Sequence, residues 1–350
     1  MRLMTQIRSP LHDRHVAADA KFADFAGWSM PLEYAGTVSE HTAVREAVGV
    51  FDVSHLGTLT VHGPLSVLNS VLTNDLDRIA DGQAQYTLLL NEAGGVVDDL
   101  IAYRVADQEA LLVPNAANHP AVARVLRDAG LEVTDITRET AILAVQGPAS
   151  DQVLPDLPDL DYMEFGAAEV AGVPVTVCRT GYTGERGVEL LVPAEQAAAV
   201  WDAVIAAGAV PCGLGARDTL RTEMGYALHG HELRPDVPAR WSSVSWAVVP
   251  DKGDFIGRQA YVDTAPEQKL VGLRVTGRGI PRADMPVVRG EQEVGLVTSG
   301  TFSPTLRVGI ALARVARDVV VGDAVDILVR GRPVSAEVVK LPFVPARVRS

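Results

Sequence analysis

Apolar and polar positions along the first three quarters of the chain predict helices mixed with hairpin-linked strands. Residues 38–48 repeat apolar side chains at helical spacing, and Gly49 would end this helix. Thr37 and Glu40 have the spacing of a capping box that would begin it. Strands are expected at 58–62, 86–90, 96–105, 111–113, 141–145 and 173–178, and further helices from Asn118, as N-cap, to Gly130 and over 194–205. This mixture favours an α+β fold over a parallel doubly wound sheet.

The last quarter of the chain changes to short apolar runs without a helical period. Turn residues separate runs at 270–275, 294–298, 310–315 and 325–329. Such a pattern predicts a small all-β domain, either a barrel or a sandwich. Residues 264–268 are the expected linker to it.

Composition narrows the function classes. With 350 residues, 47% of them hydrophobic, the chain can form two or three packed domains. A formal net charge of −13 argues against a nucleic-acid partner, which requires a basic face. The two cysteines, Cys178 and Cys212, suit a reducing cytoplasm. No signal-peptide segment or membrane-spanning apolar stretch is visible, so a cytoplasmic protein without a membrane partner is expected.

Two glycine-rich runs, 91–100 and 181–190, place acidic side chains on strands that leave tight turns. Glycine allows close approach of a ligand, and a carboxylate there can bind a cationic or hydrogen-bond-donating group or move a proton. Asp98 and Asp99 would point to opposite faces of a strand, so either one faces a cleft or both form an exposed acidic pair. Glu189 lies between apolar neighbours and could equally face a ligand or water.

Arg217 and Arg221 are one helical turn apart, after a Gly-Leu-Gly segment. They could hold a carboxylate of a ligand or form ordinary surface ion pairs, and the second alternative is the commoner one. If the two aspartates do face opposite sides of their strand, Asp98 is expected to matter much less than Asp99 for chemistry in a cleft.

Motifs for metal, nucleotide and covalent chemistry are absent from the sequence. The histidine pairs His12 and His15, and His229 and His231, lack the further ligands that zinc requires. Residues 213–217 do not complete a dinucleotide fingerprint, and there is neither a phosphate loop nor a Gly-x-Ser-x-Gly nucleophile elbow. Carboxylates and positioning are therefore the expected basis of any chemistry, without a metal.

The ordered set of short motifs resembles the aminomethyltransferase of the glycine cleavage system, the T-protein family. Single pieces are weak, but their joint order covers nearly the whole chain. The matching segments are 9–12, 25–28, 30–31, 51–55, Tyr86, 91–100, 146–148, 181–184, 215–218, 252–258 and 298–305.

This resemblance implies a three-lobed, clover-like fold. The first 265 residues would form the folate-binding region as two interleaved α+β lobes, roughly 1–50 with 140–265, and 51–139. Residues 269–350 would form a C-terminal barrel-like domain. The implied reaction takes an aminomethyl group from the dihydrolipoyl arm of lipoylated H-protein and transfers the one-carbon unit to tetrahydrofolate, the co-substrate. Ammonia and 5,10-methylenetetrahydrofolate would be the products.

The resemblance also assigns residues. Asp99 corresponds to the family's key carboxylate, and Glu189 to the acid that hydrogen-bonds the pterin. A carboxylate suits a pterin edge because two acceptor oxygens can meet two N–H donors side by side. The remaining folate-binding assignments are Arg217 as a ligand-binding arginine and Tyr86, Asn115, Tyr162 and Tyr182 as pocket-lining residues.

Alternatives within the same superfamily remain open. The folate-binding half of a demethylating oxidase would carry a flavin domain, for which this chain has no room. A folate protein of iron–sulfur or RNA maintenance would carry a Lys-Gly-Cys-Tyr-type motif, whereas residues 180–183 read Thr-Gly-Tyr-Thr. A catalytically silent folate-binding scaffold is a third possibility.

Two departures from the family pattern are Arg186, expected outside the pocket, and a tail at 346–350 without an aromatic pair.

Overall fold

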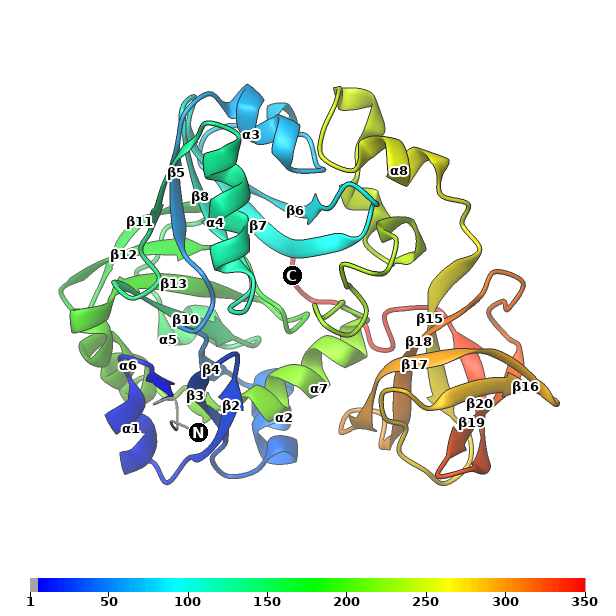
Figure 1. Cartoon of the computed structure of the whole chain (residues 1–350). Helices are drawn as coiled ribbons and strands as arrows, with labels where there is room; N and C mark the ends of the chain where they lie inside the picture. The colour runs from blue at the N-terminus through cyan, green and yellow to red at the C-terminus, as the bar shows by residue number, and fades with distance from the viewer. Residues whose placement is uncertain (1–5, 350) are drawn as a thin grey trace, which may run out of the picture.

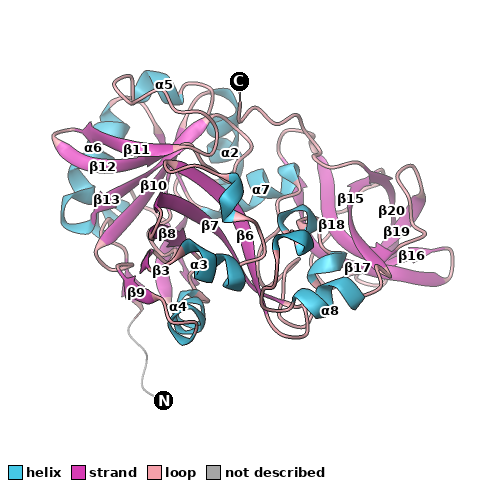
Figure 2. Cartoon of the chain, turned by 90° about the horizontal axis from the view of Figure 1, so that it is seen from above, coloured by secondary structure: helices cyan, strands magenta, loops and turns pink. Residues whose placement is uncertain are grey.

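The computed structural model describes residues 6–349 and has three lobes arranged around a common centre (Figure 1). One lobe is built on a six-stranded sheet, the second on a five-stranded sheet, and the third is a closed six-stranded barrel. A view turned by 90° shows the barrel beside the two sheet lobes (Figure 2). The predicted α+β class, with an all-β C-terminal barrel, is confirmed. The boundaries of the two interleaved lobes remain a prediction.

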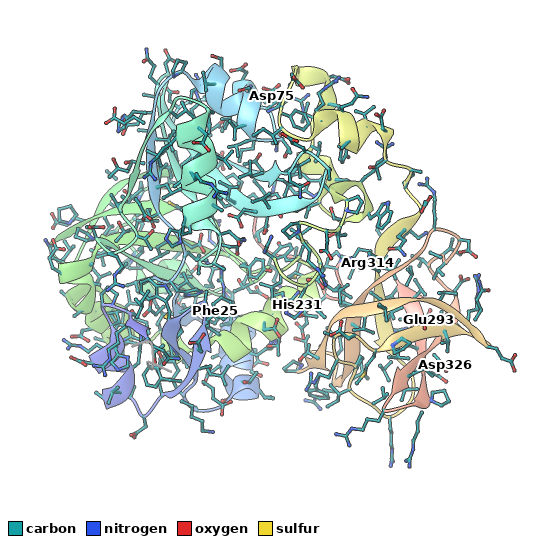
Figure 3. All side chains as sticks on the ribbon, in the orientation of Figure 1. Phe25, Asp75, His231, Glu293, Arg314 and Asp326 are labelled. Atoms are coloured by element: carbon teal, nitrogen blue, oxygen red, sulfur yellow. The ribbon has the colours of Figure 1, made fainter. Side chains whose placement is uncertain are left out.

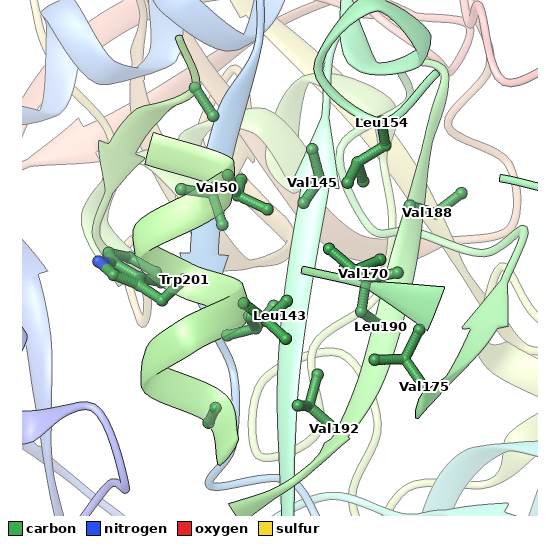
Figure 4. Packing of buried hydrophobic residues seen from close by; sticks show 14 of the residues in the cluster. Val50, Leu143, Val145, Leu154, Val170, Val175, Val188, Leu190, Val192 and Trp201 are labelled. Atoms are coloured by element: carbon green, nitrogen blue, oxygen red, sulfur yellow. The ribbon is translucent and has the colours of Figure 1, made fainter. Parts of the chain in front are cut away.

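The six-stranded sheet is covered by helices on both faces, which explains its continuous apolar strands. On β10, Leu143 and Val145 face the helix α6, while Ile142 and Ala144 face α2 and α7. Figure 4 shows Leu143 between β10 and α6, and Val145 and Trp201 belong to the same apolar cluster. The strand order is β11 (Phe165–Val170), β12 (Val173–Cys178), β13 (Gly187–Pro193), β10 (Thr140–Gln146), β4 (Gly49–Asp52) and β14 (Val210–Cys212), with helices α2 (Thr37–Glu46), α5 (Ser150–Val153), α6 (Ala197–Ala206) and α7 (Leu214–Met224).

The five-stranded sheet contains the hairpin that the sequence predicted around residues 91–95. Asn91 closes the turn by accepting hydrogen bonds from the N–H groups of Ala93 and Gly95 at 3.0 and 2.9 Å. A Cβ atom on Gly95 would lie 1.9 Å from the carbonyl oxygen of Pro235, so this position requires glycine. The order is β6 (Gln83–Leu90), β7 (Val96–Ala106), β8 (Glu109–Val113), β5 (Leu59–His62) and β9 (Glu132–Asp135), packed against α3 (Leu65–Val71) and α4 (His119–Asp128).

The barrel closes through antiparallel pairing of its first and last strands, β15 and β20. Its order is β15 (Gln268–Val275), β18 (Val308–Ala316), β17 (Gln292–Ser303), β16 (Pro286–Arg289), β19 (Ala324–Val329) and β20 (Arg332–Val339). His231 lies where the loop after α7 meets the barrel (Figure 3), and its Nδ1 donates to the carbonyl oxygen of Thr298 at 2.9 Å.

Sequence patterns missed the N-terminal sheet and several short elements. Three strands pair in the order β1, β3 and β2. These strands are too short to be recognised from the alternation of apolar and polar residues. The bounds are β1 (Ile7–Arg8), α1 (His12–Ala17), β2 (Lys21–Phe25) and β3 (Trp28–Glu33), and the connection to the barrel contains α8 (Arg258–Asp263). The 3-10 turns are η1 (Leu76–Arg78), η2 (Ala194–Gln196), η3 (Ala239–Trp241), η4 (Ser245–Ala247) and η5 (Pro250–Lys252).

The predicted capping box at the start of α2 is wrong. Thr37 donates its hydroxyl to Glu33 at 3.2 Å, and Gly36 is the residue that precedes the helix. Glu40 accepts from the N–H groups of Tyr34 at 2.6 Å and Gly36 at 3.0 Å. These local bonds connect α2 to the segment before it, and the second oxygen of Glu40 accepts a tertiary hydrogen bond from the N–H of Gly213 at 2.8 Å. The helix ends at Glu46, before the expected Gly49, because Gly49 begins β4.

One buried carboxylate, that of Glu223 on α7, joins two lobes of the molecule. Arg45 of α2 donates to it through Nε at 3.1 Å and Nη2 at 2.9 Å. From the barrel side, Ser303 donates to Oε1 at 2.5 Å and the Thr305 hydroxyl to Oε2 at 2.9 Å. His41 lies 3.3 Å from Oε2, and the Glu223 side chain is 0% exposed. A buried charge with this many donors fixes where the barrel sits on α2 and α7.

Replacing Glu223 by alanine is expected to lower the free energy of unfolding by about 3–5 kcal/mol, because the donors of Arg45, Ser303 and Thr305 lose their shared buried acceptor. Arg45 keeps its second ion pair, with Glu185. Urea denaturation would measure the change. The matched control is Glu337→Ala, which breaks an exposed barrel ion pair with Arg274 and should cost under about 1 kcal/mol. Equal losses in the two variants would contradict the assignment.

The same carboxylate gives a pH prediction. Burial alone would raise the pKa of Glu223, but hydrogen bonds and charges from His41, Ser303 and Arg45 outweigh burial and lower it to about 2. A lowered pKa contributes stability above the ordinary value of 4.5 that is lost as the pH falls towards 2. The stability difference between the wild type and Glu223→Gln should therefore shrink over this window, as followed by denaturation at several pH values. A constant difference would refute it.

Candidate active site

Asp99 of β7 lies at the centre of the first cluster of predicted site residues. The hydroxyl of Tyr86 donates to its Oδ2 at 2.9 Å, and Nδ2 of Asn115 lies 2.9 Å from its Oδ1. Burial raises the pKa of Asp99 above the ordinary value, against the opposing effects of the Tyr86 hydrogen bond and nearby His229. A carboxylate of raised pKa, held by two neutral donors, is suited to accept a proton or to face a developing cation.

Asp98 points to the other side of β7, as strand alternation predicts, but it is not exposed. Its residue exposure is 0%, which excludes the exposed acidic pair. It accepts hydrogen bonds from the backbone N–H of Asn115 at 3.1 Å, Nδ2 of Asn115 at 2.9 Å and Nδ2 of Asn118 at 2.7 Å. Burial, and then the charge of Asp99, raise the pKa of Asp98 to about 8. The sequence predicted that the Asn118 side chain caps α4. Asn118 does occupy the N-cap position, but its side chain binds the Asp98 carboxyl group and makes no capping hydrogen bond.

A second cluster contains Glu189 and Arg217. Glu189 lies on β13 between its pairing partners on β10 and β12, half-buried, and accepts a hydrogen bond from the Thr180 hydroxyl at 2.5 Å. Arg217 of α7 places its guanidinium 4.8 Å from the centre of the Tyr182 ring. Burial lowers the pKa of Arg217, and the charge of Glu189 opposes this effect. Among the described residues, its Nη1 is buried without a hydrogen-bond partner. This cluster thus offers both an acceptor and an unsatisfied cationic donor.

Tyrosines connect the two clusters. Tyr182 stacks on Tyr226 with ring centres 5.7 Å apart, and its hydroxyl donates to the carbonyl oxygen of Ala227. Burial raises the pKa of Tyr182, and Asp99 adds to this shift while Arg217 opposes it. Asp99 of the first cluster and Arg217 of the second are therefore both close enough to act on the same aromatic side chain.

Tyr162 lies near the chain's C-terminal segment. The Arg349 guanidinium lies 5.5 Å from the centre of its ring, and the backbone N–H of Arg347 donates to the Gly184 carbonyl oxygen at 2.7 Å. Figure 1 shows this segment leaving the barrel and returning to the centre of the molecule. Burial raises the pKa of Tyr162, and Glu189 adds to the shift. The tail thus places an arginine over Tyr162, and it lacks the aromatic pair of the family pattern given above.

Arg221 fits neither of the roles that the sequence allowed. Its side chain is 3% exposed and pairs with Glu232 at 3.0 Å, and its Nη2 donates to the Ser299 hydroxyl of the barrel at 2.8 Å. It therefore binds no ligand at the surface but holds α7 against the barrel. Arg217, one turn earlier, faces the tyrosines. Arg186, one of the two departures from the family pattern, pairs with the exposed Asp151 at 2.6 Å.

Three site neighbours escaped sequence reasoning. Trp246 is 65% exposed, and its ring lies 5.5 Å from that of Tyr86. It belongs to a 3-10 turn without periodicity, so no pattern marked it. His55 is buried against Phe25, with Nδ1 unpartnered among the described residues, and burial lowers its pKa to about 4. His229 acts on Asp99. In the sequence, His229 is only a candidate metal ligand and His55 only part of the motif at 51–55, and neither pattern indicates these contacts.

Within residues 6–349 there is no group of three or more His, Cys, Asp or Glu side chains that could hold a metal ion. None of the helices described is long and apolar enough to span a membrane.

Comparison with known proteins identifies the family. Residues 11–252 match the GCVT N-terminal domain, and residues 268–345 match the glycine cleavage T-protein C-terminal barrel domain. Aminomethyltransferases from Mycobacterium avium (strain 104) and Mycobacterium tuberculosis (strain ATCC 25618 / H37Rv) are each 53% identical to this chain over 98% of both sequences.

A solved structure agrees with these sequence relationships. The crystal structure of glycine cleavage system aminomethyltransferase T from Bartonella henselae superimposes with a TM-score of 0.92 at 34% identity, covering 98% of this chain and 99% of that one. The same family is thus found by sequence over both regions and by structure over the whole chain. The chain belongs to the glycine cleavage T-protein family of aminomethyltransferases.

Proposed function

We propose that the protein transfers a one-carbon unit from the aminomethylated dihydrolipoyl arm of H-protein to tetrahydrofolate, with release of ammonia. The observation that supports this most is the buried Asp99 carboxyl, which Tyr86 and Asn115 hold by hydrogen bonds. It acts on Tyr182, the ring over which the Arg217 guanidinium lies. Asp99 is thus available for proton transfer and charge stabilisation, while Glu189 and Arg217 are available to bind a polar heterocyclic ligand.

Glu189 is the proposed pterin anchor. Its strand position between β10 and β12 fixes the backbone, and the Thr180 hydroxyl occupies Oε2. The remaining acceptor capacity of the carboxylate can take N–H donors of the pterin edge. Arg217 would bind an anionic or carbonyl group of the same ligand through its unpartnered Nη1. Tyr86, Tyr162 and Tyr182 supply aromatic surface for the ring systems.

Asp99 is the proposed catalytic acid–base. Transfer breaks two bonds of the methylene carbon. The carbon–nitrogen bond breaks and the nitrogen leaves as ammonia, and the carbon–sulfur bond breaks and the lipoyl sulfur leaves as the reduced thiol. Two bonds from the same carbon to folate nitrogens replace them. The intermediate stage carries positive, iminium-like charge on that carbon. A carboxylate beside it stabilises this charge and can accept the proton that a folate nitrogen loses.

Asp99→Asn keeps the side-chain shape but removes its charge, and it is expected to reduce turnover by about 10²-fold or more. The assay measures ammonia and methylenetetrahydrofolate from aminomethylated H-protein. The matched control is Asp107→Asn, just beyond the other end of β7, where the side chain is 89% exposed and pairs with Arg104. Similar activity in the two variants would refute the role of Asp99.

Glu189→Gln replaces an acceptor by a donor and should weaken binding of reduced folate by roughly 1–3 kcal/mol, because a pterin N–H would be left unpaired. Titration calorimetry with the purified protein measures this. Glu169→Gln, exposed on β11 of the same sheet, is the control and should bind like the wild type. Unchanged affinity in Glu189→Gln would rule out Glu189 as the anchor.

A further inference from the structure

The carboxyl group of Asp98 is surrounded by hydrogen-bond donors from a single short segment. Its Oδ2 receives the backbone N–H of Asn115, and its Oδ1 receives Nδ2 of Asn115 and Nδ2 of Asn118. Leu100, the next residue on the same strand face, and Leu89, the cross-strand partner of Asp98, are 2% and 0% exposed. A carboxyl in such an apolar layer is costly unless its acceptors are occupied, and here donors occupy both oxygens.

The acceptors around Asn115 determine the orientation of its side-chain amide. Its Nδ2 lies 2.9 Å from Oδ1 of Asp98, 2.9 Å from Oδ1 of Asp99 and 2.9 Å from the Asp99 carbonyl oxygen. All three neighbours accept hydrogen bonds, so the NH2 end of the amide must face them. Among residues 6–349, no side chain donates a hydrogen bond to the opposite end, the carbonyl Oδ1 of half-buried Asn115.

We propose that Asp98 is a positioning residue that holds the side-chain amide of Asn115 in one orientation, with its N–H groups on the two aspartates and its carbonyl oxygen presented to bound folate. This inference rests on the proposed function for its ligand. It replaces the expectation that Asp98, on the far face of its strand, contributes little. Asp98 acts through Asn115 and does not touch the reacting atoms.

A carboxyl is needed at position 98 for a geometric reason. An asparagine there would place an NH2 group against the N–H donors of Asn115 or Asn118, because an amide has only one acceptor oxygen. The backbone N–H of Asn115 needs the acceptor at the place of Oδ2, so the NH2 group takes the place of Oδ1. The amide of Asn115 relieves its share of that conflict when it rotates by half a turn and offers its oxygen to residue 98. That rotation would direct an NH2 group towards the ligand and turn an acceptor away from Asp99.

The test is a double-mutant cycle on binding of 5-methyltetrahydrofolate, measured by calorimetry. Asp98→Asn is expected to weaken binding about tenfold or more, in line with a buried hydrogen bond left unmade. In the Asn115→Ala background the same substitution should change affinity less than about twofold, because its target is gone. A purely structural Asp98 would weaken binding equally in both backgrounds, and that result would overturn the proposal.

A second measurement does not need folate. With selective 15N labelling of asparagine, the side-chain amide of Asn115 should give two distinct, slowly exchanging protons in the wild type. Asp98→Asn should shift or average them, whereas the exposed control Asp107→Asn should leave them unchanged. An unchanged signal in Asp98→Asn would overturn the positioning role. If Asp98→Asn fails to fold, Asn118→Ala removes one donor from Asp98 and should give the same effects, smaller in size.

The two hypotheses fail in different ways. If the wild type does not bind the reduced folate, the proposed function falls, and with it the presentation of Asn115 to that ligand. The amide signal then still decides whether Asp98 orients Asn115. If the wild type binds folate and the cycle shows no coupling between residues 98 and 115, the function stands and this inference is wrong.

Discussion

The arrangement of the molecule depends on the charges buried along α7. Glu223 at its end is held by Arg45 from α2 and by Ser303 from the barrel, and Arg221 reaches a second barrel serine. These contacts are directional and costly to break, so they fix the helix relative to two lobes. Arg217, on the same helix, is thereby placed over Tyr182 in the site. A structural ion network and the side chain proposed to bind the ligand therefore share one rigid element.

The site itself is divided between elements that have no local relation. Asp99 comes from the hairpin of the five-stranded sheet, and Glu189 from a central strand of the six-stranded sheet. The hairpin is held in place because Gly95 packs directly against Pro235 of the segment after α7. Rigid strands on both sides allow two carboxylates to keep different environments, one surrounded by neutral donors and one beside a guanidinium. These environments suit Asp99 to the proposed proton transfer and Glu189 to the proposed binding of the ligand.

The acidic pair shows how a local pattern takes its meaning from its surroundings. Alternation along β7 correctly separates Asp98 from Asp99, but it cannot tell that both faces of this strand are covered. Once covered, each carboxyl needs donors, and the chain supplies them from the residues after β8. Asn115 lies between the two acids and couples them. A residue on the apparently idle face thus becomes part of the site's geometry.

The sequence alone determined the α+β class, the β6–β7 hairpin and the all-β end, because periodicity and turn glycines are local properties. The order of its motifs indicated the family and, through it, the candidate site residues. Tertiary structure decided what local rules could not. Glu40 looked like part of a local capping box and Asn118 like a side-chain cap, yet Glu40 also binds the N–H of Gly213 and the Asn118 side chain binds Asp98. Arg221 looked exposed, yet the barrel buries it. Polar side chains are satisfied by whichever partner the fold brings near, and such partners lie tens of residues away in the chain.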